Sequence, residues 1–536
     1  MTDIEIPYVK DRSRRYRFFE ILPGALSWFV LALPFLLSLI SVRLAAVFVL
    51  GYLLFYFTRA MATNLRALQG YKRLQAYQKI NWNQLLEDLE LFEVKGGGKR
   101  PSWHKPNIER VATQGFIIKP SEVLQVAMVA MYNESQAVVE PTIQSVLASD
   151  YDAKRIVLVI AYEERGGERT EQVATDMLKK YGDQFFHAMI VKHPKDIEGE
   201  IIGKGGNITY AGRQLQTYLE QQNIDPLRVI VTTLDADNQP HPQYFSALTY
   251  VYCSTEDPTY VSYQPIAMYT KNIWDAPAPM RVIATGNTLW NIVLTLRPHV
   301  LRNFSAHAQS MKALIETDFW SVRTIVEDGH QFWRSYFRFE GNHKVYPVYL
   351  PIYQDAVLAD TYVHTLKAQF VQLRRWTWGA SDVAYVAEKA FFTKNTIPLH
   401  KRLAKFGRLL EGHVNWAVAP VLLTFSAFVP SLLNPESLAA YELPLVVSRV
   451  QTIALVGLLA SLFICLKTLP PKPARYKRHR SLWMLLQWVY MPVTTLLYSS
   501  LAAFNSQTRL IFGKYLGKFD VTEKAVINDK SGKAEL

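Results

Sequence analysis

Cysteine is almost absent from this chain, which has only Cys253 and Cys465 among its 536 residues. Cys253 lies in a polar region and Cys465 in an apolar stretch, which excludes a disulfide framework and a metal site built from cysteines. Charge is also missing from several long apolar stretches. They are residues 21–40, 44–58, 414–433, 450–466 and 481–508. Transporters and channels carry ionisable side chains inside such stretches, so their absence argues against both functions.

The uncharged stretches have the length of membrane spans. A spanning helix needs about 20 apolar residues. Residues 21–40 meet this length, and residues 44–58 meet it when the flanking arginines extend toward the membrane surfaces. The alternative interpretation is a long pair of buried helices. No small-residue cleavage site precedes the second stretch, so we do not expect a cleaved signal peptide.

Basic residues indicate how these spans are oriented. Residues 1–20 and 467–480 are rich in Lys and Arg, whereas the expected loop 434–448 holds Glu436 and Glu442 without Lys or Arg. The positive-inside rule places the first two regions in the cytosol and the third outside. An even number of N-terminal spans then places the central region in the cytosol. We expect a multi-pass protein of the plasma (inner) membrane.

The net charge and the last apolar stretch bear on the partners and on the number of spans. The net charge is +13, but the basic residues lie beside apolar stretches. We therefore expect them to meet anionic membrane lipid, and we expect no nucleic acid partner. Met491-Pro492 interrupts the last apolar stretch, and proline kinks helices. The number of C-terminal spans and the side of the C-terminus therefore stay open.

The central region alternates between strand and helix patterns. Strand patterns cover residues 124–130, 156–161, 188–191 and 228–233, and helix patterns cover residues 140–148, 170–181 and 208–221. This alternation predicts a mostly parallel sheet covered on both faces. In such sheets, ligands bind at the carboxyl ends of the strands. Polar residues that follow these ends are Asn133, Glu134, Glu163, Asp235 and Asp237.

Two pairs of carboxylates are candidates for metal binding and for proton transfer. Asp235 and Asp237 end a strand, and two hard oxygen donors can hold Mg²⁺ or Mn²⁺ on a diphosphate. A solvated turn or a helix cap is the alternative for an isolated Asp-x-Asp. Glu327 and Asp328 follow about 90 residues later in an aromatic setting. A carboxylate there can take the proton of an attacking hydroxyl, although such pairs are also common on surfaces.

Two basic motifs lie on either side of these carboxylates in the chain. Gln372-Leu373-Arg374-Arg375-Trp376 offers an arginine for diphosphate and an indole face for a sugar ring. Its alternative is an amphipathic helix on the membrane surface. Lys204-Gly205-Gly206-Asn207 begins a helix before Asp235. It lacks the spacing and the Ser or Thr of a phosphate-binding P-loop.

Taken together and in this order, these motifs resemble the family 2 membrane-embedded glycosyltransferases, which include cellulose, chitin and hyaluronan synthases. The resemblance covers residues 120–385. It implies a Rossmann-like α/β glycosyltransferase domain of the A type, inserted between transmembrane helices. It implies an inverting hexosyltransferase with a UDP-sugar donor and Mg²⁺ or Mn²⁺. The Gln-x-x-Arg-Trp motif accompanies processive synthesis with export in this family.

Residue roles are carried over by motif. The donor would be bound by Asn133, Glu134, Glu163, Lys204, Asp235 and Asp237, and the last two would also bind the metal. Asp328 would be the general base, supported by Glu327. Gln372, Arg375 and Trp376 would frame the acceptor and the pyrophosphate.

The sequence departs from the family pattern at two places. Glu163 stands where an Asp usually holds the nucleobase, which leaves the base open. Residues 303–307 lack the glycine-rich acceptor loop, which leaves the acceptor open: a growing glycan or a lipid-linked acceptor. Alternatives to processive synthesis are the addition of one sugar to a lipid-linked acceptor and an inactive membrane scaffold. The sugar, the linkage, partner subunits and a homo-oligomer also stay open.

The expected organisation has seven parts. They are a basic cytosolic N-terminus (1–20), two transmembrane helices (21–62), a cytosolic linker or helical region (63–119), the cytosolic glycosyltransferase domain (120–365), amphipathic interfacial helices with the Gln-x-x-Arg-Trp motif (366–407), C-terminal transmembrane helices (408–512) and a cytosolic tail (513–536).

Overall fold

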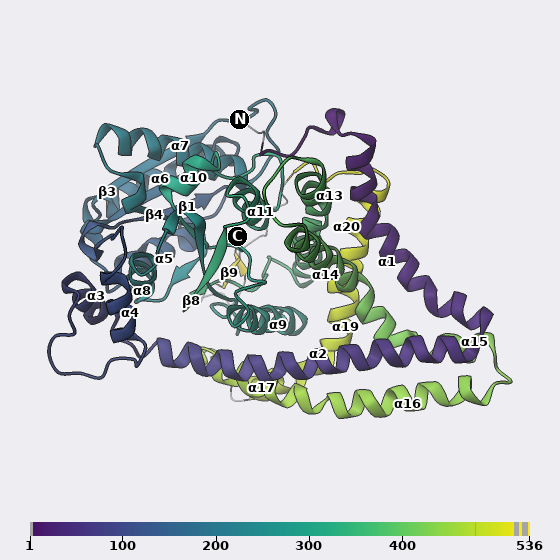
Figure 1. The fold of residues 1–536 in the computed structure, drawn as a ribbon. Coiled ribbons are helices and arrows are strands. Elements are labelled where there is room, and N and C mark those ends of the chain that lie inside the picture. The colour runs from purple at the N-terminus through teal and green to yellow at the C-terminus, as the bar shows by residue number, and fades with distance from the viewer. Residues whose placement is uncertain (1–3, 478, 519–524, 528–533, 536) are drawn as a thin grey trace.

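The computed structural model describes residues 4–477, 479–518, 525–527 and 534–535. An α/β domain occupies one side of the molecule and long helices extend from the other (Figure 1). The domain contains a sheet with the strand order β3-β2-β1-β4-β7-β6-β8-β5. The strands are β1 (Leu124–Met131), β2 (Ile156–Glu163), β3 (His187–His193), β4 (Val229–Asp235), β5 (Gln239–Pro240), β6 (Val261–Met268), β7 (Ala308–Ser310) and β8 (Lys344–Tyr353).

Most strands of this sheet run in one direction. β1 pairs in parallel with β2 and β4, β2 with β3, and β6 with β8. Only the short strands β5 and β7 pair in the antiparallel sense. The predicted mostly parallel sheet is therefore confirmed, and the four strands expected from the sequence are β1 to β4. The sequence patterns did not predict β5 to β8.

Alternating side chains of the central strands enter two separate cores. Ala127 and Val129 of β1 pack with α5 (Gln136–Leu147), α6 (Gly167–Tyr181) and α8 (Tyr244–Cys253) on one face. Val126 and Met128 pack with α7 (Lys204–Gln221) and α10 (Met311–Glu316) on the other. All four strand side chains are fully buried. Strands that are buried on both faces read as continuous apolar runs, which explains the sequence pattern.

Further helices surround this domain. They are α3 (Trp82–Leu91), α4 (His104–Ala112), α9 (Ala278–Thr295), α11 (Glu327–Arg338), α12 (Tyr362–Thr377) and α13 (Asp382–Ala387). In the described residues, two helices are long and apolar enough to cross a membrane, α1 (Arg14–Ile40) and α2 (Val42–Tyr77). They meet at Ser41, and α2 continues along the α/β domain (Figure 1).

One loop prediction was wrong. Residues 434–448 were expected to connect two spans, but only residues 434–437 lie between α15 (Phe428–Leu433) and α16 (Leu438–Ala454). Ser437 caps α16 by accepting a hydrogen bond from the Ala440 amide. Glu442 lies exposed on the helix, so an acidic residue there does not break it. With α17 (Val456–Thr468), α16 follows α2 along much of its length (Figure 1).

The remaining helices are α14 (Leu399–Phe425), α18 (His479–Leu486), α19 (Met491–Thr494) and α20 (Leu501–Ile511). The stretch that contains Pro492 is helical but irregular. A 3₁₀ turn at Gln487–Tyr490 precedes this proline, and a π-helical segment at Thr495–Ser500 follows it. Proline lacks a backbone N–H and disturbs the regular ladder, which accounts for the irregular turns.

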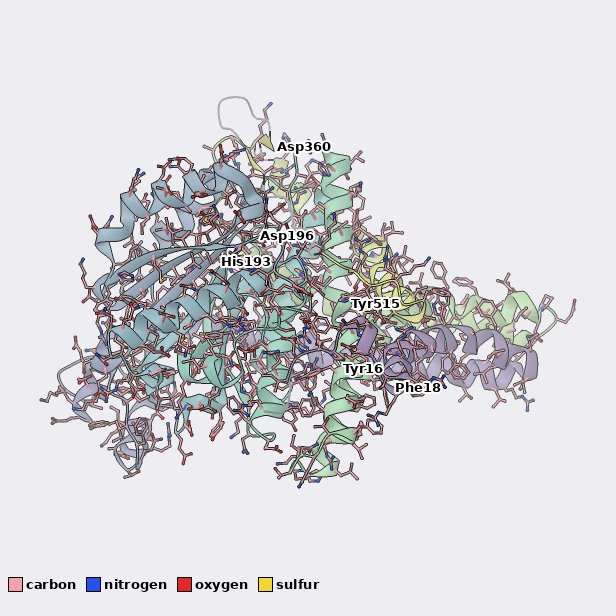
Figure 2. The ribbon with its side chains drawn as sticks, turned by 90° about the horizontal axis from the view of Figure 1, so that it is seen from above. Tyr16, Phe18, His193, Asp196, Asp360 and Tyr515 are labelled. Carbon is pink, nitrogen blue, oxygen red and sulfur yellow. The ribbon has the colours of Figure 1, made fainter. Side chains whose placement is uncertain are left out.

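The start of α1 lies beside the residues that follow α20. The buried carboxylate of Glu20 in α1 accepts hydrogen bonds from Arg12 and Arg17 at 2.7 Å each and from the Tyr515 hydroxyl at 2.9 Å. Figure 2 shows Tyr515 beside Tyr16 and Phe18. Beyond Tyr515, the Ala525 amide donates to the carbonyl of Leu358 at 2.9 Å, two residues before Asp360, which Figure 2 labels.

Candidate active site

The carboxyl ends of the parallel strands form one polar edge. β1 and β4 run in register, with Ala130 beside Asp235, and β2 ends at Glu163 on the other side of β1. Asn133 is exposed just after β1, and Asp237 is 5% exposed just after β4. The strand ends therefore bring these predicted residues to one edge of the sheet, as expected.

Lys204 joins this edge to the second carboxylate pair. Its ammonium group lies 2.8 Å from Oδ1 of Asp235 and 3.4 Å from Oδ2 of Asp328. Burial opposes the charged form, but Asp235, Asp328 and Glu327 outweigh it and raise the pKa of Lys204. Lys204 thus stays positively charged between two carboxylates that lie more than 90 residues apart in the sequence.

Two glycines allow Lys204 to reach this place. A Cβ on Gly205 would lie 2.4 Å from the carbonyl oxygen of Ser321, and one on Gly206 would lie 2.5 Å from a Glu200 carboxylate oxygen. A larger side chain at Gly205 would push the start of α7 away from the backbone that leads into α11, whereas one at Gly206 would displace the Glu200 side chain. The Lys-Gly-Gly sequence is therefore a close-packing feature, which the motif alone did not indicate.

Glu327 and Asp328 open α11, with Asp328 facing His307. Oδ1 of Asp328 lies 3.5 Å from Nδ1 of His307. Glu327 is 2% exposed, and its Oε2 atom has no hydrogen-bond partner among the described residues. Burial, and then the negative charge of Asp328, raise the pKa of Glu327. Glu327 therefore favours its protonated form, while Asp328 is held by Lys204.

His307 was not a candidate in the sequence. It is fully buried, its Nδ1 lies 2.9 Å from the carbonyl of Phe304, and its Nε2 accepts from the Trp320 indole at 3.0 Å. These contacts assign the proton to Nδ1. Burial lowers the pKa of His307 and keeps it neutral. The preceding Ala306 has φ +67°, a conformation that favours glycine, so the loop has a glycine-like backbone without glycine.

Three more polar residues missed by the sequence patterns complete the carboxylate edge. The Ser305 hydroxyl donates to Oδ2 of Asp235 at 2.6 Å. The Asp355 amide donates to Oδ2 of Asp237 at 2.9 Å. The Asp355 carboxylate lies 3.4 Å from Lys271, whose ammonium group also donates to the Asp237 carbonyl at 3.5 Å. None of these residues belongs to a motif, which explains why the sequence did not reveal them.

The Gln-x-x-Arg-Trp motif lies on α12, next to the carboxylates. The Trp376 and Tyr269 rings have centroids 5.9 Å apart at 45°. Burial first, and then Asp235, Asp237 and Asp328, raise the pKa of Tyr269, while Arg375 opposes this shift. Tyr269 therefore lies between the motif and the carboxylates. Gln372 accepts a hydrogen bond from Gln369 at 2.9 Å within the same helix.

The expected nucleotide side lies at the ends of β1 to β3. Glu163 forms an ion pair with Arg165, and burial raises the pKa of Glu163. Glu134 accepts from the Tyr132 amide at 2.8 Å. At the end of β3, His193 lies 3.0 Å from Glu200, in the region labelled by His193 and Asp196 in Figure 2.

Asn207 has a structural part in this region. Its amide nitrogen lies 3.3 Å from the Met131 carbonyl and 3.0 Å from the Ala161 carbonyl. It therefore donates to the ends of both β1 and β2, and fixes the two strand ends beside the start of α7.

A cavity of about 450 Å³ adjoins this edge. Its wall includes Lys271 and Gln239 from the domain, Gln75 of α2 and Gln78 just after it, and Lys467 at the end of α17. The cavity thus connects the neighbourhood of Asp237 with the ends of two long helices. A hexose unit or two would fit in a space of this size.

The donor set suits a divalent cation that is shared with a diphosphate. In the described residues, no group of three or more His, Cys, Asp and Glu side chains could hold a metal alone. Mg²⁺ usually takes one or two protein carboxylates and completes its shell with phosphate and water. Asp235 and Asp237 meet that requirement. Acidic groups at this edge also exceed the positive charges of Lys204, Lys271 and Arg375.

No known family profile and no curated protein matches the chain. Several solved glycosyltransferase structures are similar to it. The mannosyltransferase PcManGT of Pyrobaculum calidifontis, in complex with GDP-Man and Mn²⁺, is 14% identical with a TM-score of 0.42, and the match covers 92% of this chain and 100% of that one. S. aureus TarS 1–349, in complex with UDP-GlcNAc, is 10% identical with a TM-score of 0.33, covering 77% and 96%. GalNAc-T7 with UDP, GalNAc and Mn²⁺ is 13% identical with a TM-score of 0.30, covering 54% and 55%.

Proposed function

We propose that this chain is an inverting glycosyltransferase of the membrane-embedded family 2 type. It would transfer a sugar from a UDP-sugar to a growing glycan. The observation that carries this proposal is the position of Lys204 between Asp235 and Asp328. It joins a carboxylate suited to a metal-bound diphosphate to a carboxylate suited to deprotonate an acceptor. The two halves of a glycosyl transfer then lie on either side of one ammonium group.

The donor would lie along the carboxyl edge of the sheet. Asp235 and Asp237 would hold Mg²⁺ or Mn²⁺, which when bound neutralises charge on the diphosphate leaving group. Lys204 and Arg375 add positive charge on the same side. Asn133, Glu134 and Glu163 would contact the nucleoside, where Glu163 can accept hydrogen bonds from a base or a ribose.

The acceptor would be activated by Asp328. As its hydroxyl oxygen attacks the anomeric carbon, the proton passes to Asp328, and the bond from carbon to the diphosphate oxygen breaks with its electron pair. Attack from the face opposite the leaving group inverts the anomeric centre. Glu327, held protonated, avoids a second negative charge beside the base, and neutral His307 lies 3.5 Å from Asp328 while its Nδ1–H donates to the Phe304 carbonyl.

The membrane part would receive the product. α1 and α2 support insertion into a membrane, and the Lys- and Arg-rich segments support a cytosolic catalytic domain. Trp376 would stack on the acceptor sugar, and the cavity between Lys271 and Lys467 could take the next units. This arrangement favours processive elongation of an extracellular or cell-wall polysaccharide with export. Addition of one sugar to a lipid-linked acceptor is the second candidate, because the same cavity reaches the helix ends.

The first test uses the purified full chain in nanodiscs, radiolabelled UDP- and GDP-sugars, and Mg²⁺ or Mn²⁺. A high-molecular-weight product from one or two donors is expected. A product with a single added sugar, formed only with a lipid acceptor, would replace processive synthesis by the second candidate. Absence of turnover and of donor binding with every sugar nucleotide would leave a membrane scaffold, and would refute the proposal.

A further inference from the structure

A second group of charged side chains comes from α2, from the segment after α9 and from α14, and its members interact electrostatically with one another. We name it the cationic cluster. It consists of Arg59 and Arg66 of α2, Arg297 and His299 after α9, Arg302, and Lys405 and Arg408 of α14. Neither the motifs nor the proposed reaction uses these residues.

Packing of the backbone elements brings these residues together. Gly70 of α2 lies against Ile292 of α9, where a Cβ would come within 2.6 Å of the Ile292 side chain. Leu301 and Leu409 belong to one buried apolar cluster, which sets the segment after α9 beside α14. α9 lies along α2 in Figure 1. Three segments distant in sequence thus converge on one surface.

Negative charge does not balance this cluster. The neighbouring carboxylates are Glu411 and Asp382, and both are engaged. Glu411 pairs with Arg59 and accepts from Asn415 at 2.6 Å, and Asp382 lies 2.8 Å from His330. Within residues 4–477 and the other described segments, no carboxylate forms an ion pair with the remaining cations, which are Arg66, Arg297, Arg302, Lys405 and Arg408.

The cations are also held in place. The Arg302 guanidinium lies 4.6 Å from the centre of the Trp333 ring, and the Lys405 ammonium lies 4.9 Å from that of Phe332. Such contacts fix cations on aromatic faces. Burial lowers the pKa of Arg302 to about 10, the negative charge of Asp382 opposes this shift, and the positive charge of Arg408 adds to it. Partly desolvated, mutually repelling cations are unfavourable without an anion.

Exposed apolar side chains lie next to the cluster. On α2, Phe55 lies one turn before Arg59 and is 50% exposed, and Leu65 precedes Arg66 and is 58% exposed. On α14, Leu403 is 52% exposed, two residues before Lys405. A ligand that satisfied both features would carry a phosphate next to an acyl chain. We propose that the cationic cluster binds the phosphate group of an anionic membrane lipid at the cytosolic face.

This proposal rests on the membrane insertion in the proposed function, but its test needs no catalysis. The thermal midpoint of the full chain in neutral detergent would be followed with dioctanoyl-phosphatidylglycerol, dioctanoyl-phosphatidylcholine or inorganic phosphate. A ligand that binds only the folded state raises the midpoint. At ten times its dissociation constant, phosphatidylglycerol should raise it by about 1–3 °C. Phosphatidylcholine and inorganic phosphate should leave it unchanged.

Variants then locate the site. Arg302→Gln with Lys405→Gln should remove the shift, and Arg302→Lys with Lys405→Arg should keep it. The matched control is Lys401→Gln with Lys477→Gln, which removes two exposed cations elsewhere, one of them a turn away on α14. Retention of the shift in this control supports a defined site.

Three other outcomes would overturn the proposal. The thermal midpoint could stay unchanged with phosphatidylglycerol, rise equally with phosphatidylcholine, or lose its rise in the Lys401→Gln, Lys477→Gln control as well. An equal shift with inorganic phosphate would refute a lipid as the source. If the Arg302→Gln, Lys405→Gln variant fails to fold, two results still test the lipid site. They are the comparison of phosphatidylglycerol with phosphatidylcholine and the shift in the Arg302→Lys, Lys405→Arg variant. If the protein shows no transfer with any donor but its thermal midpoint still rises with phosphatidylglycerol, the proposed reaction is refuted and the lipid site is kept.

Discussion

The active site and the cationic cluster carry excess charge of opposite sign. At the sheet edge, acidic groups exceed the basic ones, and burial, followed by the charge of Asp328, raises the pKa of Glu327. In the cationic cluster, basic groups exceed the acidic ones, and burial lowers the pKa of Arg302. An excess of charge of one sign is costly in a partly buried place. The comparison teaches that each site is complete only with a ligand of the opposite charge, a metal cation in the first and a phosphate in the second.

Removing the base should give the largest effect on the acidic side. Asp328→Asn keeps the shape of the side chain but cannot accept the proton of the acceptor. Transfer is expected to fall by about 10²–10⁴-fold, the usual contribution of a general base. Donor binding, measured by titration with a UDP-sugar and Mn²⁺, should persist. Wild-type turnover in this variant would remove Asp328 from the mechanism.

Removing one carboxylate of the acidic excess should weaken metal-dependent binding. Asp237→Ala is expected to weaken donor binding in Mn²⁺ by about tenfold or more, which corresponds to ~1.4 kcal/mol. Binding without metal should change little. Isothermal titration with UDP in the presence and absence of Mn²⁺ measures both. If Mn²⁺ strengthens UDP binding equally in the variant and the wild type, Asp237 does not bind the metal.

His307 should have a smaller effect that acts through Asp328. His307→Phe removes the N–H that donates to the Phe304 carbonyl, whereas His307→Asn keeps a donor near Nδ1. We expect His307→Phe to lower kcat by about tenfold with little change in the KM of the donor, because the loop beside Asp328 loses the hydrogen bond that fixes it. His307→Asn should recover part of kcat. Equal losses of kcat in the two variants, or a matching rise in the donor KM, would leave His307 a purely structural role.

The sequence revealed what was local in the chain and missed what was distant. β1 to β4 and their terminal residues were predicted, because apolar runs and the polar residues after them are neighbours in sequence. Ser305 and Asp355 were not predicted. They reach Asp235 and Asp237 across 70 and 118 residues, through the unpredicted half of the sheet. The loop predicted at residues 434–448 was wrong because its bounds were set by the neighbouring uncharged stretches, whereas α16 begins at Leu438 and continues past Glu442.

The proton on Glu327 makes a prediction about stability. Because burial raises its pKa in the folded protein, the folded chain keeps a proton that the unfolded chain releases at its ordinary pKa of 4.5. The free energy of unfolding should therefore fall as the pH rises from that value through the raised pKa. Glu327→Gln cannot ionise and should lose this decline. Thermal midpoints of both proteins from pH 5 to 9 measure it, and parallel curves would contradict the raised pKa.

Ala306 should give the smallest effect, and it tests the loop that joins the two carboxylate pairs. Its φ of +67° strains an alanine, and a glycine there would relieve about 1 kcal/mol. Loss of a buried methyl group costs about 0.8 kcal/mol. Ala306→Gly should therefore change the stability little, with turnover kept within about twofold. Ala308→Gly in β7 is the matched control, since Ala308 is equally buried but has no positive φ. It should lose about 1–2 kcal/mol in thermal or denaturant unfolding. Equal losses in the two variants would show that the backbone of Ala306 carries no strain, and that the loop holds Ser305 and His307 in place without it.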